Sequence, residues 1–331
     1  MIIKRYIKYI ISLFFHYSGF NLWYIKKHKL HYILMFHRLE DSVDSLNISI
    51  PIRFLKSIIQ WSDSLGELCG LDDLLKAKSQ STRFSLTFDD GFENIIQVKS
   101  LLPSTPIILY LATDYIESDR KFWALELEYL IINSDQPYLD LSDFNLGRYD
   151  FINENSKYLA ISKLNNELKG FHPNDIDLII RKLRNNISML YKEEFNNMFL
   201  SWEQVNSLIE GGMEIGGHTH SHVISSKVSP DEFKYELQIS NGLIKSHTGI
   251  TPKHFAYPNG RQQDIALSSR DQLKEEGYIS AVTTVEGANE VGDDPFLLKR
   301  FNVTKDRVSN PFGLPSKAMF TMMLVNPFRF F

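Results

Sequence analysis

Ser85-Leu86-Thr87-Phe88-Asp89-Asp90-Gly91 joins a short apolar run to two adjacent carboxylates and a glycine. Thr87 and Phe88 favour a strand, and Gly91 permits a sharp turn where that strand ends. Two carboxylates held side by side raise one another's pKa unless a proton or a metal ion neutralises them. The stretch therefore predicts a buried strand that carries Asp89 and Asp90 to a functional edge of a sheet.

A second polar cluster lies far downstream, where His218, His220 and His222 fall within five residues after two glycines. His218 and His222 are four residues apart, so they share a face in a helix or a tight turn, and His220 lies on another side. One carboxylate and two imidazoles suit zinc and leave coordination positions open, whereas structural zinc sites are closed and rich in thiolates. Cys69 is the single cysteine. The two clusters therefore predict a divalent metal site of the catalytic kind, with the remaining carboxylate available as a general base.

These two stretches resemble the polysaccharide deacetylases of carbohydrate esterase family four, the NodB-homology proteins. In that family a Thr-Phe-Asp-Asp-Gly block supplies the base from its first aspartate and a metal ligand from its second. The resemblance therefore assigns Asp89 as the base and Asp90 as a ligand. The family's His-Ser/Thr-x-x-His block supplies two more ligands, which correspond to His218 and His222 and leave His220 as a spectator.

The resemblance extends through most of residues 32–301. Residues 255–260 read Phe-Ala-Tyr-Pro-Asn-Gly and are similar to the family's third block, where a backbone N–H helps to hold the oxyanion; Asn259 takes that place. Many members carry in this block an arginine that orients the base, but Ala256 stands there in this chain. Arg300 is the candidate substitute, and an ordinary surface ion pair is the alternative.

The family's late leucine-x-histidine block, which supplies the general acid, is missing because no histidine follows His254. Residues 32–36 read as a buried strand that delivers His37, followed by Arg38, to the same edge of the sheet. This stretch resembles the early histidine-arginine block of the exopolysaccharide deacetylase branch, in which the histidine lies at the active site. His37 is therefore the candidate general acid, with a hydrogen-bonded histidine near the core as the alternative.

Strand and helix patterns alternate along most of the chain. The runs of strand length are residues 32–36, 84–88, 106–112, 213–217, 254–257, 278–283 and 296–301. Such alternation predicts a mainly parallel sheet with functional residues at the carboxyl ends of the strands. Combined with the resemblance, the expected fold is α/β, a distorted NodB-like (β/α) barrel of about seven parallel strands with a helical insertion.

Three segments divide the chain. They are a basic and apolar N-terminal segment, residues 1–30; the deacetylase domain, residues 31–310; and an apolar C-terminal tail, residues 311–331. An insertion at about 115–200 interrupts the domain, with helices expected over residues 122–132, 154–168 and 175–191. Within it Phe122 and Trp123 are either sugar-facing aromatics or buried anchors, and burial is the favoured interpretation.

Composition and charge limit the class of protein. The chain has 331 residues, 43% of them hydrophobic, and a formal net charge of −4, so it can bury a large core and offers no electrostatic case for nucleic acid. One cysteine fits a reducing compartment, and an exported bacterial protein that lacks disulfides is the alternative. Lys4, Arg5 and Lys8 interrupt an apolar stretch that is too short to span a bilayer and precedes no cleavage site. We expect a cytoplasmic protein; whether the two apolar ends pack on the domain or lie on the inner membrane stays open.

The expected function is metal-dependent de-N-acetylation of N-acetylated sugars in a polysaccharide or glycan precursor of the cell envelope. The resemblance implies a carbohydrate substrate, and a lipid-linked one is an open alternative. Zinc is the expected cation. A deformylase or an O-acetyl esterase on the same scaffold, or a non-catalytic glycan-binding protein, are the alternatives. The presence of Asp89 and of every expected ligand argues against binding alone.

Overall fold

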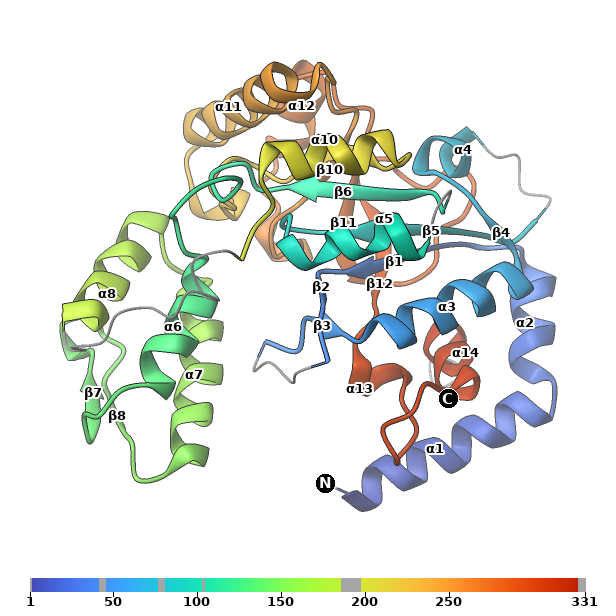
Figure 1. Cartoon of the computed structure of the whole chain (residues 1–331), viewed down its shortest axis with the longest axis horizontal. Helices are drawn as coiled ribbons and strands as arrows, with labels where there is room; N and C mark the ends of the chain where they lie inside the picture. The colour runs from blue at the N-terminus through green and yellow to red at the C-terminus, as the bar shows by residue number, and fades with distance from the viewer. Residues whose placement is uncertain (1, 42–45, 77–80, 103–104, 186–197, 327–331) are drawn as a thin grey trace.

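The computed structural model describes residues 2–41, 46–76, 81–102, 105–185 and 198–326, and its centre is a closed barrel of seven parallel strands (Figure 1). Around the barrel the order is β1 (His31–Phe36), β12 (Leu298–Asn302), β11 (Ser280–Glu286), β10 (His254–Ala256), β9 (Glu214–Gly217), β6 (Ile107–Leu111) and β5 (Arg83–Phe88), which pairs back with β1. A short strand, β4 (Glu67–Leu68), pairs with the start of β5. All seven strands predicted from the apolar runs are present, and the NodB-like barrel is confirmed.

The pairing of β1 with β5 fixes the register of the functional edge. Their six residue pairs run from His31 opposite Arg83 to Phe36 opposite Phe88. The Phe36 and Phe88 rings stack with centroids 5.1 Å apart, which closes the core beneath the strand ends. Both strands are buried almost throughout, as parallel strands covered on both faces usually are. Because the two strands end side by side, the residues that follow them emerge at the same edge.

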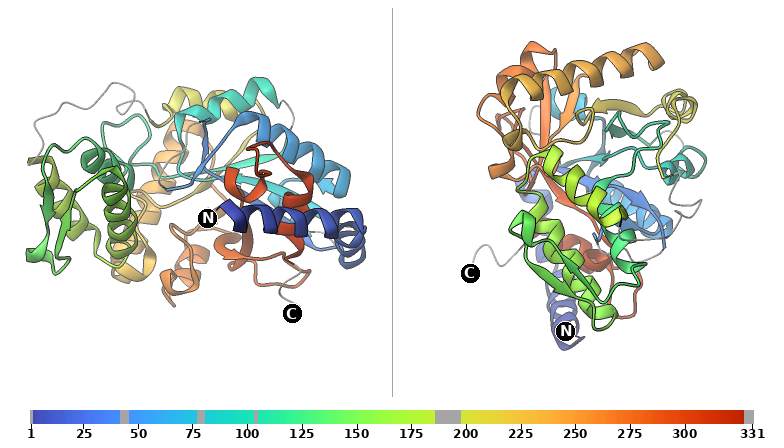
Figure 2. Two further views of the ribbon diagram at one scale, coloured as in Figure 1. Left: turned by 90° about the horizontal axis from the view of Figure 1, so that it is seen from below. Right: turned by 90° about the vertical axis from the view of Figure 1, so that its left-hand side faces the viewer.

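Helices cover the outside of the barrel (Figures 1 and 2). They are α3 (Ile52–Leu65), α4 (Leu71–Lys76), α5 (Gln97–Leu101), α10 (Trp202–Glu210), α11 (Pro230–Thr248), α12 (Ser269–Glu275) and α13 (Lys305–Val308). Two of these helices begin at capping boxes, with Ser201 before α10 and Ser229 before α11. Gly249 ends α11 at φ 75°, a backbone conformation that suits glycine.

The helical insertion lies to one side of the barrel, between β6 and β9 (Figure 1). It contains α6 (Trp123–Ile132), a hairpin of β7 (Tyr138–Asp140) with β8 (Arg148–Asp150), α7 (Glu154–Leu168) and α8 (Pro173–Asn185). These elements bury a hydrophobic core of their own, which includes Leu127, Ile161 and Ile179. The hairpin was not predicted, because each of its strands has only three residues. Residues 186–191, the end of the third expected helix, lie outside the described part.

The two ends of the chain pack together beside the barrel. Helices α1 (Ile2–Tyr17) and α2 (Phe20–His28) contact α14 (Lys317–Val325), and the Asn21 side chain donates a hydrogen bond to Thr321. Residues 318–325 are all buried, so this part of the apolar tail is protein core rather than a lipid-facing surface. Phe328, Phe330 and Phe331 lie outside the described residues. Among the described helices, none combines the length and the apolar character needed to cross a bilayer.

Candidate active site

The structure brings all seven predicted site residues together, six of them just after strand ends and Arg300 from within a strand. Six of them line one pocket of about 490 Å³: His37, Asp89, Asp90, His218, His222 and Asn259. They follow β1, β5, β9 and β10, so four loops at one edge of the barrel converge. Arg300 lies within β12, is fully buried and reaches the site from beneath. Parallel strands therefore assemble residues that lie far apart in the sequence.

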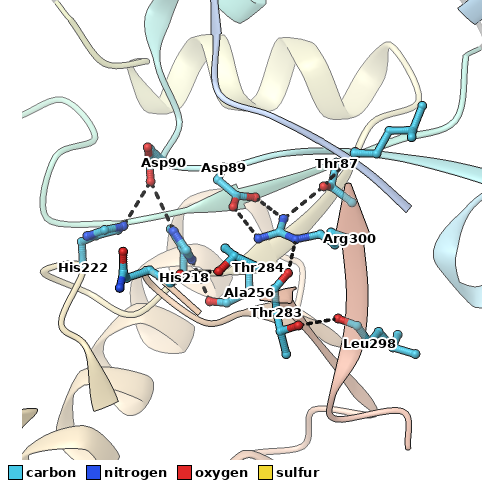
Figure 3. A network of polar contacts seen from close by, with 12 residues as sticks. Thr87, Asp89, Asp90, His218, His222, Ala256, Thr283, Thr284, Leu298 and Arg300 are labelled. Carbon is cyan, nitrogen blue, oxygen red and sulfur yellow. Dashed lines mark hydrogen bonds and ion pairs between the residues drawn. The ribbon is translucent and has the colours of Figure 1, made fainter. Parts of the chain in front are cut away.

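Asp90, His218 and His222 form a compact cluster, shown in Figure 3. Asp90 Oδ1 lies 3.2 Å from His218 Nε2 and 3.3 Å from His222 Nε2. Asp90 and His222 adopt left-handed backbone conformations, with φ 74° and φ 58°, which are uncommon for residues other than glycine. Strain of this kind persists only where the surrounding structure holds it, and it concentrates at functional sites.

The donor atoms of this cluster fit a divalent cation. Asp90 Oδ1 is buried and has no hydrogen-bond partner among the described residues, although two imidazole nitrogens face it. His218 Nδ1 lies 2.7 Å from the Ala256 carbonyl oxygen; a proton on Nδ1 would donate to that oxygen and leave Nε2 free to bind a metal. Burial lowers the pKa of His222 and so favours the neutral, ligating form of that ring. An oxygen and two nitrogens are a common donor set for zinc.

Asp89 and Arg300 form a bidentate ion pair beside the cluster (Figure 3). Arg300 Nη1 donates to Asp89 Oδ1 and Nη2 to Oδ2, both at 2.7 Å. The same guanidinium donates to the Thr283 carbonyl oxygen at 2.8 Å and to Thr87 Oγ1 at 3.1 Å, so its plane is fixed. Burial by itself raises the pKa of Asp89, but the charge and hydrogen bonds of Arg300 outweigh it and hold that pKa below its usual value. Asp89 is therefore an ionised carboxylate.

Asn259 lines the pocket and has a free backbone donor in the described structure. The Asn259 backbone has φ 58°. Its side-chain amide donates a hydrogen bond to Asp264, and its carbonyl oxygen accepts one from Thr284 Oγ1 at 2.6 Å. Its own N–H donates to no acceptor in the described part of the chain. Gly260 is required in the turn, because a Cβ there would lie 2.8 Å from the Tyr257 carbonyl oxygen. The Asn259 N–H is thus a preorganised and unused donor.

His37 and His220 occupy different surroundings. His37 lines the pocket directly after β1, and its Nδ1 is buried without a hydrogen-bond partner in the described structure. His220 turns away from the cluster toward Thr113, whose Oγ1 lies 3.0 Å from His220 Nδ1, and toward Asp114 at 3.5 Å from Nε2. His220 therefore supports the loop from outside the cluster, as the sequence indicates.

Two aromatic residues of the insertion complete the pocket wall. Phe122 is buried and packs edge-on against the His222 ring, with centroids 4.8 Å apart. Trp123 is partly exposed, and both residues line the pocket. The favoured burial interpretation thus describes Phe122, whereas Trp123 remains available to a ligand.

Three supporting residues escaped the sequence analysis. Thr87 and Thr283 fix Arg300, and Asp264 holds the side chain of Asn259. Thr87 lies inside the Asp-Asp block and could have been considered, because the side chain two residues before Asp89 points to the same side of the strand. Thr283 acts through its backbone carbonyl, and no side-chain pattern marks such a role.

Comparisons with known proteins agree with this geometry. Residues 179–278 match the family model described as polysaccharide deacetylase, a range that includes the histidine cluster and Asn259. The Bacillus subtilis (strain 168) protein YxkH, whose name places it provisionally among the polysaccharide deacetylases, is 25% identical over 133 residues. That alignment covers 40% of this chain and 47% of YxkH, so the chain matches about half the length of this curated relative.

Two solved structures share the fold. IcaB from Ammonifex degensii is 17% identical with a TM-score of 0.54, over 84% of this chain and 93% of that one. The Streptococcus pyogenes deacetylase PplD, solved in complex with acetate, is 14% identical with a TM-score of 0.54, over 86% and 96% of the two chains. Barrel and edge cluster together define the NodB-like class. Within that class, residues 179–278 are similar to the polysaccharide deacetylase family, and so is the YxkH relative.

Proposed function

We propose that the protein is a metal-dependent hydrolase that removes the acetyl group from an N-acetylated sugar of a glycan. The observation that carries the proposal is the ionised Asp89, fixed by Arg300, beside the cluster of Asp90, His218 and His222. The match of residues 179–278 to the polysaccharide deacetylase model supports a deacetylase, and the acetate complex of PplD supports acetate as the product. The complete set of reactive side chains favours catalysis over simple glycan binding.

Asp90, His218 and His222 would hold the cation, and zinc is the expected one. When bound, a divalent cation there supplies Lewis-acid polarisation of the acetamide and acidification of a water molecule. Asp89 accepts the proton of the attacking water. Each oxygen of Asp89 accepts one hydrogen bond from Arg300 and so keeps a lone pair for this transfer.

The other groups act on the substrate directly. The Asn259 N–H donates a hydrogen bond to the carbonyl oxygen as negative charge develops there, because this donor has no competing partner among the described residues. His37 delivers a proton to the departing sugar nitrogen, since it lines the same pocket from the neighbouring strand. The products would be a free amino sugar and acetate.

Acetate release from N-acetylglucosamine oligomers tests this function. The metal-loaded enzyme should release acetate, and chelation or Asp89→Asn should abolish the release. Asp63→Asn, at an exposed position on α3, is the matched control and should leave it unchanged. N-formyl and O-acetyl analogues belong in the same panel. If only the N-formyl analogue were hydrolysed, the protein would be a deformylase. If only the O-acetyl analogue were hydrolysed, it would be an esterase.

We further propose that the N-terminal helices place the enzyme on an anionic membrane surface. One face of α1 carries an exposed apolar stripe at helical spacing, made of Ile3, Ile7, Ile10, Phe14 and Tyr17, each 52–81% exposed. Trp23 of α2 and Phe312 are also more than half exposed. Residues 1–30 contain six lysines and arginines and no acidic residue, in a chain of net charge −4. An apolar stripe with basic neighbours suits an anionic lipid interface, and the location of the protein would follow from it.

A further inference from the structure

The pocket has a cationic wall that the proposed reaction does not use. Lys121, Lys169, Lys227 and Arg261 all line the pocket that contains Asp89 and the metal-binding cluster. Lys169 directly follows α7 in the insertion, and Arg261 lies in the loop after β10, two residues beyond Asn259. Insertion and barrel therefore both contribute cations to one cavity.

These four cations differ from the other basic residues of the pocket. Arg120 pairs with Asp114 and Asp177, and Arg307 pairs with Glu286. For Lys121, Lys169, Lys227 and Arg261, the described part of the chain offers no ion pair with an acidic side chain. The remaining pocket carboxylates do not neutralise these four cations either, because Asp89 pairs with Arg300 and Asp90 belongs to the metal-binding cluster.

Lys169 shows that this arrangement is electrostatically unfavourable without a ligand. Burial lowers the pKa of its ammonium group, and the nearby charge of Arg261 lowers it further. The charge of Asp264 raises the pKa of Lys169. However, Asp264 Oδ2 already accepts hydrogen bonds from the Asn259 side chain and from the Arg261 N–H. Two like charges held close together, one of them half-buried, are the usual environment of a site that binds an anion.

A second observation on the same wall points independently to a ligand. Asn165 lies in the last turn of α7, four residues before the C-cap residue Lys169, whose backbone is still helical. Both side chains therefore lie on one side of the helix end, and both line the pocket. Asn165 is 94% buried, since its exposed fraction is 6%, yet its Oδ1 has no hydrogen-bond partner in the described structure. The hydroxyl of Tyr257, a residue that also lines the pocket, is likewise buried and unpartnered. Buried polar atoms without partners are costly, and a sugar with hydroxyl and amide groups would satisfy them.

We propose that the substrate glycan carries an anionic group, a phosphate or a carboxylate, close to the N-acetyl group that is hydrolysed, and that Lys169 and Arg261 bind it. Lys227 and Lys121 add positive charge around it, and Asn165 contacts the sugar that bears it. The inference rests on the proposed deacetylase function and narrows its substrate class. A neutral N-acetylglucosamine polymer would leave the cations uncompensated, so it is the poorer substrate. Lys169 and Arg261 are thus specificity-determining residues.

Steady-state acetate release from three probes tests this inference with the full-length, metal-loaded enzyme. The probes are a neutral N-acetylglucosamine tetramer, an oligosaccharide in which N-acetylglucosamine alternates with a uronic acid, and an N-acetylglucosamine that bears a phosphodiester. The variants are Lys169→Met and Arg261→Gln, with Lys56→Met on the exposed face of α3 as the matched control. Comparison of the two acidic probes distinguishes a carboxylate from a phosphate.

We expect the wild-type enzyme to favour one acidic probe, and each pocket variant to raise KM for that probe by about tenfold, with kcat retained, because each removes one charge-assisted contact. KM for the neutral tetramer should not change, and Lys56→Met should behave as wild type. Equal KM changes on neutral and acidic probes, or a wild-type preference for the neutral tetramer, would overturn the inference.

A binding measurement separates failure of the inference from failure of the proposed function. Calorimetric titration of the metal-free protein with the two acidic probes needs no turnover. Tighter binding of an acidic probe than of the neutral tetramer, weakened by Lys169→Met and by added salt, would support the anion site even if no acetate were released. Equal binding of all three probes would refute it, whatever the activity.

Discussion

Arg300 of β12 donates one hydrogen bond to each carboxylate oxygen of Asp89, both at 2.7 Å, and the two side chains are almost completely buried. In this chain the arginine lies on β12 and not in the block of residues 255–260. In that block Ala256 takes the arginine's place, and its carbonyl oxygen contacts His218. Arg300 can therefore orient and stabilise the ionised Asp89 from β12. A buried carboxylate that must stay ionised needs a fixed cation, and a planar guanidinium can bind both of its oxygens.

Arg300→Met should destabilise the metal-free protein by about 3–5 kcal/mol, because it leaves the Asp89 charge buried without a partner. Urea unfolding measures the change. Combining Arg300→Met with Asp89→Asn should recover part of the loss, since no uncompensated charge then remains. Arg270→Met is the control, because Arg270 pairs with Asp294 near the surface and should cost about 1 kcal/mol or less. Equal costs at the two arginines would contradict the assigned role of the buried pair.

Metal content should depend on His222 and not on His220. His222→Ala removes one of three donor atoms, so bound metal should fall from about one equivalent to a small fraction, and acetate release should fall with it. His220→Ala lies in the same loop but outside the cluster, and it should retain the metal. Elemental analysis of the purified variants gives the answer. Loss of metal in both variants, or in neither, would refute the proposed ligand set.

Much of the barrel was predictable because each parallel strand is a short apolar run bounded by turns. The seven runs mark buried strands, and the polar residues at their ends mark the functional edge. The hairpin from Tyr138 to Asp150 was not predictable in this way. Each of its strands has three residues with a single buried side chain, which is too short for a period of two to be recognised.

The residues of the site also differ in how well the sequence predicts them. Asp89, Asp90, His218 and His222 stand in compact blocks, and the sequence analysis singled them out as residues of one site, where the structure places them together. Lys169 could not be found, because it reaches the pocket only through the packing of the insertion against the barrel. Residues in compact blocks can be recognised in a sequence, whereas an isolated lysine that only tertiary packing brings to the pocket cannot.

His37→Ala should lower kcat by roughly 10²-fold with little change in KM, because the departing amine would lose its proton donor. His37→Gln keeps a polar side chain of similar size and should be nearly as slow. Acetate release under saturating substrate measures both variants, and their metal content should equal that of the wild type. An unchanged kcat in His37→Ala would mean that another group protonates the amine.

Membrane contact should depend on the apolar stripe of α1. Ile7→Glu and Ile10→Glu each place a negative charge on an exposed face that makes few contacts with the rest of the protein, so folding should be retained while binding to anionic vesicles is lost. Sedimentation with vesicles of phosphatidylglycerol and phosphatidylcholine measures the bound fraction.

Leu159→Glu, at a 71% exposed position on α7, is the matched control and should bind as the wild type does. Binding should weaken at high salt, since the basic residues near the stripe contribute through their charge. If the wild type stays in solution with these vesicles, or if all three variants bind equally, the stripe serves another partner and the enzyme acts away from the bilayer.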